Sequence, residues 1–212
     1  MEILLIIILS LWLFRKPSNH LYCGIFAWTG DSNKKFNWDK FNMLGILNNE
    51  RGKDSCGRAS GNISQYGTGK YSNYDDFIKE TPPFPIRERM IIGHDRKASW
   101  GYTVNEENAQ PVILEEGNEV VFILAHNGTI HNIDDLAKKY NIIKGNNTDS
   151  WVLANIIYKN GFNVLKEYEG AASLVIYDRR KYLETGDTHI HLFKGESKYN
   201  SWTQISSEER PL

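Results

Sequence analysis

The stretch Cys-Gly-Ile-Phe-Ala-Trp occupies residues 23–28, and its apolar run predicts a strand over residues 23–29. A cysteine at the first position of a chain carries a free α-amino group. That amine, with a reference pKa of about 7.7 to 8.0, can accept the proton of the thiol beside it. Cys23 joined to Tyr22 lacks this base, because an amide nitrogen is not basic near neutral pH. Whether Cys23 is a nucleophile with its own base or an inert thiol therefore depends on the bond that precedes it.

Residues 1–22 differ in composition from the rest of the chain. Residues 3–14 are apolar apart from Ser10, and a polar, basic segment follows them. Such a run is too short to cross a bilayer, and its positive charges lie after it, the reverse of the order in secretory signals. We interpret residues 1–22 as an apolar leader or propeptide outside the fold, or as the product of a start codon assigned too far upstream. Its association with membranes stays open.

Residues 23–212 are expected to form one domain, and their polar end, residues 206–212, leaves open whether the final strand of the domain is present. The chain carries 25 basic and 26 acidic residues with no long block of either sign, so we expect no nucleic-acid partner. Its two cysteines form neither a disulfide framework nor a Cys-x-x-Cys pair. We therefore expect a cytoplasmic location, or membrane association or export if the leader is functional.

Strands and helices alternate along the chain, which predicts a mixed α/β fold. The spacing of Phe41, Leu44 and Leu47 indicates a helix with one apolar face. Asn132, and Thr148 or Asn147, are candidate N-caps of two further helices. The elements predicted in this way are helices over residues 38–49, 132–140 and 148–158, a helical turn over 75–79, strands over 89–93, 119–126, 171–177 and 189–193, a short extended segment over 58–63, and a turn-rich loop over 100–110.

Four further motifs lie at separated positions along the chain. They are Arg-Gly-Lys-Asp-Ser-Cys-Gly at residues 51–57, Gly-His-Asp-Arg-Lys-Ala-Ser at 93–99, His-Asn-Gly-Thr-Ile-His-Asn at 126–132 and Thr-Asp-Ser at 148–150. Together with Cys-Gly-Ile-Phe at residue 23, their order and spacing resemble the class II glutamine amidotransferases over residues 23–177. The motifs are most similar to the glucosamine-6-phosphate synthase and amidophosphoribosyltransferase branch. The resemblance implies an N-terminal-nucleophile hydrolase fold, a four-layer αββα sandwich with two antiparallel sheets.

The resemblance also implies the chemistry of the site, which is hydrolysis of the glutamine side-chain amide to glutamate and ammonia. Cys23 is the expected nucleophile, forming a γ-glutamyl thioester with its α-amine as base. Asn127 and Gly128 are the expected oxyanion hole, since a side-chain amide and a neighbouring main-chain N–H can point at one developing oxyanion. Without the other motifs, an ordinary Asn-Gly turn would explain this pair. No cofactor and no metal are expected.

Substrate binding is assigned by the same resemblance. Arg96 matches the residue that binds the glutamine α-carboxylate, a role suited to the bidentate geometry of a guanidinium. Asp149 matches the residue that binds the α-ammonium, and Ser99 adds a hydroxyl. Arg51 and Asp54 are expected to support the site. A surface arginine and an aspartate in the first turn of a helix are the alternatives for Arg96 and Asp149.

Several features limit these assignments. Lys-Ala-Ser-Trp-Gly at residues 97–101 departs from the Trp-Ala-Thr-His-Gly that glucosamine-6-phosphate synthases commonly carry, which makes affinity for L-glutamine less certain than the chemistry. The resemblance covers no acceptor domain, so a separate ammonia-accepting enzyme is the expected partner. Cys56 is expected to pack in the core, and His189 with His191 lacks a third metal ligand. The alternative functions are another N-terminal cysteine amidohydrolase, or a non-catalytic, membrane-tethered binding module that keeps its leader.

Overall fold

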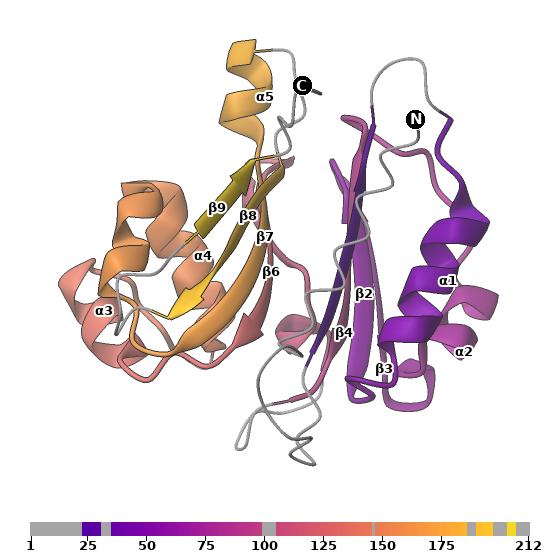
Figure 1. Cartoon of the computed structure of the whole chain (residues 1–212), viewed down its shortest axis with the longest axis horizontal. Coiled ribbons are helices and arrows are strands. Elements are labelled where there is room, and N and C mark those ends of the chain that lie inside the picture. The colour runs from indigo at the N-terminus through magenta and orange to yellow at the C-terminus, as the bar shows by residue number, and fades with distance from the viewer. Residues whose placement is uncertain are drawn as a thin grey trace. The chain divides into compact units, whose positions relative to one another are not determined.

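The computed structural model describes residues 23–30, 35–98, 105–145, 147–185, 190–196 and 203–206. The expected leader, residues 1–22, and the predicted substrate residue Ser99 lie outside the described residues. The chain divides into two compact units, Met1–Pro111 and Val112–Leu212, and each unit is presented by itself (Figure 1).

The first unit is a four-stranded antiparallel sheet with strand order β1-β4-β2-β3. Figure 1 shows α1 and α2 on one face of this sheet, where they contact each other. Asn37 caps the N-terminus of α1 by accepting a hydrogen bond from the Lys40 amide at 2.9 Å. The elements are β1 (Gly24–Thr29), α1 (Trp38–Asn48), β2 (Ser55–Ser60), β3 (Ile63–Thr68), η1 (Gly69–Tyr71), α2 (Tyr74–Glu80), β4 (Met90–Arg96) and η2 (Glu106–Asn108).

A buried arginine organises the polar part of this core. The Arg58 side chain is 0% exposed, and its guanidinium lies 4.6 Å from the centre of the Trp38 ring. It donates to Gln65 Oε1 at 2.8 Å, to Asn42 Oδ1 at 3.1 Å and to the Thr81 carbonyl at 2.9 Å. Burial of the cation lowers its pKa. Arg58 thereby joins β2 to β3, to α1 and to the segment after α2.

The second unit is a five-stranded antiparallel sheet in the order β5-β6-β7-β8-β9. Its core packs α3 and α4 against the sheet through buried aliphatic side chains such as Leu124, Leu136 and Leu153. The elements are β5 (Val112–Glu116), β6 (Glu119–Gly128), α3 (Ile133–Lys139), α4 (Asp149–Asn160), η3 (Phe162–Glu167), β7 (Ala171–Asp178), α5 (Arg179–Thr185), β8 (Ile190–Glu196) and β9 (Thr203–Ser206).

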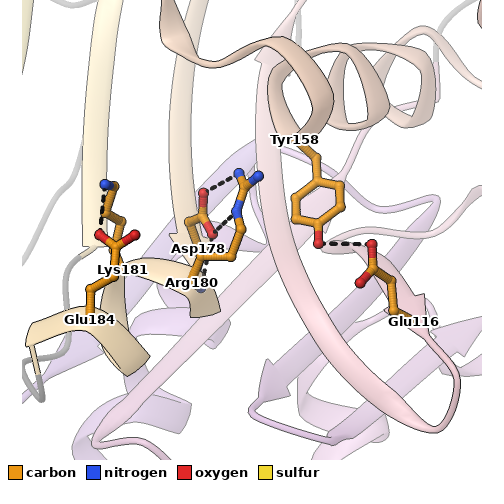
Figure 2. A network of polar contacts seen from close by, with 6 residues as sticks. All are labelled: Glu116, Tyr158, Asp178, Arg180, Lys181 and Glu184. Carbon is orange, nitrogen blue, oxygen red and sulfur yellow. Dashed lines mark hydrogen bonds and ion pairs between the residues drawn. The ribbon is translucent and has the colours of Figure 1, made fainter.

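A polar network fixes α5 at the end of β7 (Figure 2). Arg180 donates to both carboxylate oxygens of Asp178, at 2.9 Å and 2.6 Å, and its guanidinium lies 4.2 Å from the centre of the Tyr158 ring. The Tyr158 hydroxyl donates to Glu116 at 2.9 Å. Because β6 and β7 are antiparallel, with Phe122 opposite Asp178 and Gly128 opposite Ala172, this network lies at the end of the sheet remote from Gly128.

Most of the predicted strands and helices are present, and the corrections have local physical causes. The segment predicted as extended over residues 58–63 is interrupted by a turn at Gly61, φ +52°, which begins the hairpin to β3. Leu47 is exposed, because it lies well off the buried face of α1 that Phe41 and Leu44 define. Strands β3 and β5 and helix α5 were not predicted.

The predicted N-caps had different outcomes. Thr148 caps α4 by accepting from the Trp151 amide at 3.3 Å, as expected. Asn132 precedes α3 but makes no side-chain cap, which corrects the prediction. Its amide instead donates to the Glu167 carbonyl at 2.8 Å and accepts from the Glu169 amide at 3.0 Å. Hydrogen bonds to residues distant in sequence have replaced the local N-cap of α3.

Candidate active site

Cys23 lies directly before β1 with its thiol against the peptide group of Lys97. The Lys97 amide donates to the sulfur at 3.3 Å, and the sulfur lies 3.5 Å from the Lys97 carbonyl oxygen. The Arg51 guanidinium donates to the Cys23 carbonyl at 3.2 Å. Both ends of the residue are therefore held, and the half-buried thiol is not part of a disulfide.

The turn that carries Arg51 approaches the end of β4 very closely. A Cβ atom on Gly52 would lie 2.5 Å from the Arg96 carbonyl carbon and 2.7 Å from the Lys97 nitrogen, so only glycine fits. Asp54 closes the contact, since its carboxylate accepts from the Ala98 amide at 2.7 Å and pairs with the Lys97 ammonium at 3.1 Å. The Arg-Gly-x-Asp motif thus holds the chain segment on which the Cys23 thiol rests.

Arg96 is the last residue of β4, between the two neighbouring strands of the sheet. Its register partner on β2 is Ser55, and the pairing of β4 with β1 ends one residue earlier, so Arg96 and Cys23 stand at adjacent strand ends. The Arg96 side chain is only 4% exposed. A cation held at such a position costs desolvation energy, which a bound carboxylate would offset.

Asp95 is a second buried charge-bearing residue at this strand end, and no motif or periodicity singled it out. It is 0% exposed, and burial raises its pKa well above the ordinary value of an aspartate. Its Oδ1 atom accepts from Asn49 at 3.4 Å. The same Asn49 amide donates to the Gly52 carbonyl at 3.1 Å, which ties Asp95 to the Arg51 turn.

Asn127 and Gly128 occupy the end of β6 in the second unit, opposite Ser173 and Ala172 of β7. Asn127 is 7% exposed. A Cβ atom on Gly128 would lie 2.5 Å from the Ala171 carbonyl oxygen, so close packing against β7 requires glycine here. The pair is therefore part of the sheet rather than of a free Asn-Gly turn, which removes the simple turn as an explanation.

Asp149 is the first residue of α4 and is half-buried. Its Oδ1 atom accepts from the Ser150 amide at 2.8 Å and lies 3.3 Å from the Ser150 hydroxyl. Within the ranges that the structure describes, no cationic side chain pairs with this carboxylate. The second oxygen, Oδ2, is thus left for another donor, as an ammonium-binding residue would need.

His126 is a buried residue beside Asn127 to which sequence analysis assigned no role. Its two ring nitrogens lie 2.9 Å from the Ser150 hydroxyl and 3.2 Å from the Tyr168 hydroxyl. Burial lowers the pKa of the imidazole, and the negative charge of Asp149 opposes that effect. The motif His-Asn-Gly contained the residue, but its partner Tyr168 is distant in sequence, so nothing local indicated the contact.

The remaining candidates give no second reactive centre. Cys56 is buried in the core of the first unit and its sulfur contacts the Tyr71 carbonyl at 3.4 Å, while burial raises the pKa of its thiol. The His191 ring packs 4.7 Å from that of Phe162, and His189 lies outside the described residues. Among the residues placed by the structure, no cluster of His, Cys, Asp and Glu could hold a metal ion. Nor does that part of the chain contain a helix with the length and apolarity needed to span a membrane.

Comparison with known proteins finds similarity to glutamine amidotransferases. Residues 84–185 match the model of a family described as a glutamine amidotransferase domain. The putative asparagine synthetase [glutamine-hydrolyzing] 2 of Methanocaldococcus jannaschii is 32% identical over 85 residues, which are 39% of this chain and 16% of that protein. A solved structure titled as the allosteric regulatory enzyme of purine biosynthesis superposes with a TM-score of 0.53 at 17% identity, covering 89% of this chain and 49% of that chain.

The chain is therefore similar to a glutamine amidotransferase domain over residues 84–185, which are just under half of its length. The similarity to glutamine amidotransferases and the N-terminal-nucleophile hydrolase fold predicted from the motifs are confirmed, with two antiparallel sheets that each carry helices. The chain spans about half the length of the purine enzyme and matches about a sixth of the asparagine synthetase. The structure places Cys23 and Arg96 in one unit of the chain, and Asn127 and Asp149 in the other.

Proposed function

We propose that this domain hydrolyses the side-chain amide of L-glutamine through a γ-glutamyl thioester on Cys23. In a chain that begins at Cys23, the α-amine takes the thiol proton and the thiolate attacks the amide carbon. The resulting oxyanion is stabilised by the Asn127 side-chain amide and the Gly128 N–H. The leaving nitrogen takes a proton and departs as ammonia, and water then cleaves the thioester to give glutamate.

The anchoring of Cys23 is the observation that carries this proposal. Its carbonyl is held by Arg51 and its thiol by the Lys97 peptide, at the strand end where Arg96 is buried. A fixed thiol beside a buried cation suits attack on an amino acid whose α-carboxylate needs a partner. Asp149, with one carboxylate oxygen open, suits the α-ammonium of the same substrate. In this proposal Arg51 and Asp54 support the site, and Ser99 supplies a further hydroxyl for substrate binding.

The first experiment determines where the purified chain begins. Intact mass and N-terminal sequencing of the protein from cells expressing the full chain should give a species beginning at Cys23. A chain that retains Tyr22 would lack the base and should hydrolyse no glutamine. Fractionation of the same cells tests the expected cytoplasmic location against a membrane-bound or exported form.

The second experiment replaces each cysteine in turn and measures glutamate release from glutamine. Cys23→Ala should abolish turnover while the folded state persists, whereas Cys56→Ala is the matched control and should retain turnover because its thiol is buried. Turnover that survives Cys23→Ala would remove the nucleophile assignment. A panel of other amides separates glutamine from a different amide substrate.

We also propose that the ammonia passes to a separate acceptor enzyme. Affinity purification of the tagged chain from its own cells should recover such an enzyme, and its presence should change glutamine turnover. Recovery of no enzyme, with turnover unaffected by any added synthase, would contradict this part of the proposal.

A further inference from the structure

A continuous line of hydrogen bonds runs through the second unit from the start of α4 to the residue after β6. The Ser150 hydroxyl lies 3.3 Å from Asp149 Oδ1 and 2.9 Å from His126 Nδ1. The other ring nitrogen, Nε2, lies 3.2 Å from the Tyr168 hydroxyl, which also reaches the Thr129 carbonyl at 3.1 Å. The line therefore ends at the carbonyl of Thr129, the residue that follows Gly128.

The interior of this line is shielded from water. His126 and Ser150 are each 2% exposed and Tyr168 is 0% exposed. Burial lowers the pKa of His126 and raises that of the Tyr168 hydroxyl, so the imidazole and the phenol are both neutral near pH 7. A neutral imidazole has one N–H donor and one acceptor nitrogen. The tautomer of His126 is thus set by which of its two neighbours donates to it.

The number of protons available explains why the hydrogen bonds of this line can change when a ligand binds. It contains four contacts, but the Tyr168 hydroxyl, the Ser150 hydroxyl and the neutral imidazole supply only three protons between them. One of the four contacts must therefore lack a proton. With no ligand present, the Ser150 hydroxyl donates to the Asp149 carboxylate, the stronger acceptor, so the contact without a proton lies further along the line.

A ligand ammonium on Asp149 decides the arrangement. The ammonium donates to the carboxylate in place of Ser150, so the Ser150 hydroxyl donates to His126 Nδ1 instead. The imidazole proton then lies on Nε2, and Tyr168 donates to the Thr129 carbonyl. We propose that His126 is a positioning residue that couples ammonium binding at Asp149 to the backbone beside Asn127 and Gly128. This rests on the proposed function, in which Asp149 receives the glutamine α-ammonium.

The test is nitrogen NMR of the protein labelled with ¹⁵N-histidine, using L-glutamate as the probe so that no turnover is needed. The His126 resonances are identified as those moved by both Ser150→Ala and Tyr168→Phe, each of which removes one partner. Addition of glutamate should shift them to the tautomer protonated on Nε2. Glutarate, which lacks the α-ammonium, should leave them unchanged, and Asp149→Asn should abolish the response to glutamate.

Steady-state kinetics distinguish a coupling role of His126 from a purely structural one. Tyr168→Phe should lower kcat about tenfold, the rate equivalent of one lost hydrogen bond, while KM changes less than about twofold. Ser150→Ala should mainly raise KM. Tyr158→Phe is the matched control, because its hydroxyl contacts Glu116 at the remote end of the same sheet, and it should leave both constants unchanged.

The outcomes separate this inference from the proposed function. A chain that binds glutamate without any change at His126, or a Tyr168→Phe variant that behaves as Tyr158→Phe does, overturns the coupling. A chain that binds no glutamate overturns both the coupling and the substrate assignment. The full NMR response in a chain that hydrolyses no glutamine supports the coupling and overturns the proposed chemistry alone.

Discussion

Gly52→Ala adds one methyl group at the point where the Arg51 turn meets the end of β4. The new Cβ would lie 2.5 Å from the Arg96 carbonyl carbon, 2.6 Å from the Asp95 oxygen and 2.7 Å from the Lys97 nitrogen. All three are backbone atoms, which cannot rotate away as a side chain could. The turn itself must therefore move outward.

The cost of that movement can be worked from the contacts it breaks. Overpacking of this kind costs about 1–3 kcal/mol. The movement also lengthens the hydrogen bond from the Asp54 amide to the Arg96 carbonyl, now 3.0 Å, and the bond from the Ala98 amide to the Asp54 carboxylate, now 2.7 Å. Partial loss of both adds about 1–2 kcal/mol. We expect a total loss in the free energy of unfolding of about 2–5 kcal/mol.

Gly117→Ala is the matched control, because the same methyl group meets open space there. Gly117 has φ +65°, and no atom lies within 4 Å of its added Cβ. Only the cost of a left-handed alanine applies, which is about 1–2 kcal/mol. The two substitutions therefore separate steric exclusion from backbone conformation.

Urea denaturation followed by circular dichroism measures both variants against the unaltered chain. The melting temperature should fall by about 2–4 °C for each kcal/mol in a chain of this size. At a temperature where all three remain folded, Gly52→Ala should also raise KM for glutamine, since the end of β4 carries Arg96. If Gly52→Ala costs no more stability than Gly117→Ala and leaves KM unchanged, the close approach does not hold the site together.

Three further predictions follow from buried charges in the first unit. Arg96→Lys should raise KM for glutamine about tenfold or more with a smaller effect on kcat, because an ammonium cannot bind a carboxylate bidentately; steady-state kinetics measure this, and an unchanged KM would contradict the assignment. Asp95 has a pKa raised by burial in the folded state, so its contribution to stability is complete below about pH 3.8 and is lost as the pH rises toward the folded pKa. Asp95→Asn should remove this loss, and urea midpoints measured from pH 4 to pH 8 should fall less in the variant than in the unaltered chain. Arg58→Ala should lower the free energy of unfolding by about 3–5 kcal/mol, because it leaves buried acceptors unpaired and a cavity beside Trp38; denaturation that shows less than 1 kcal/mol would refute the structural role.

Much of the fold was accessible from local patterns. The buried strand over residues 119–126 and the capped helix that starts at Asp149 were predicted because hydrophobic spacing and a Thr N-cap act within a few residues. Strands β3 and β5 were not predicted, because β3 has few apolar residues and the apolar run of β5 is only three residues long, while both are stabilised by pairing with β2 and β6. The Asn132 cap was wrong for a similar reason, since the distant Glu169 amide donates to the side-chain oxygen in place of the helix amides.

The sequence by itself predicted the reacting groups and the similarity to glutamine amidotransferases, because ordered motifs record which residue types the chemistry needs. Cys23, Arg96, Asn127, Gly128 and Asp149 could all be named without coordinates. Only the tertiary structure decided how these groups are held. The hydrogen bonds of Arg51 and Lys97 to Cys23 depend on close approach between segments far apart in the chain. The hydrogen bonds that link Asp149 to His126 through Ser150 depend on it too. Such contacts leave no local periodicity, since each partner is selected by its position in space rather than by its neighbours in sequence.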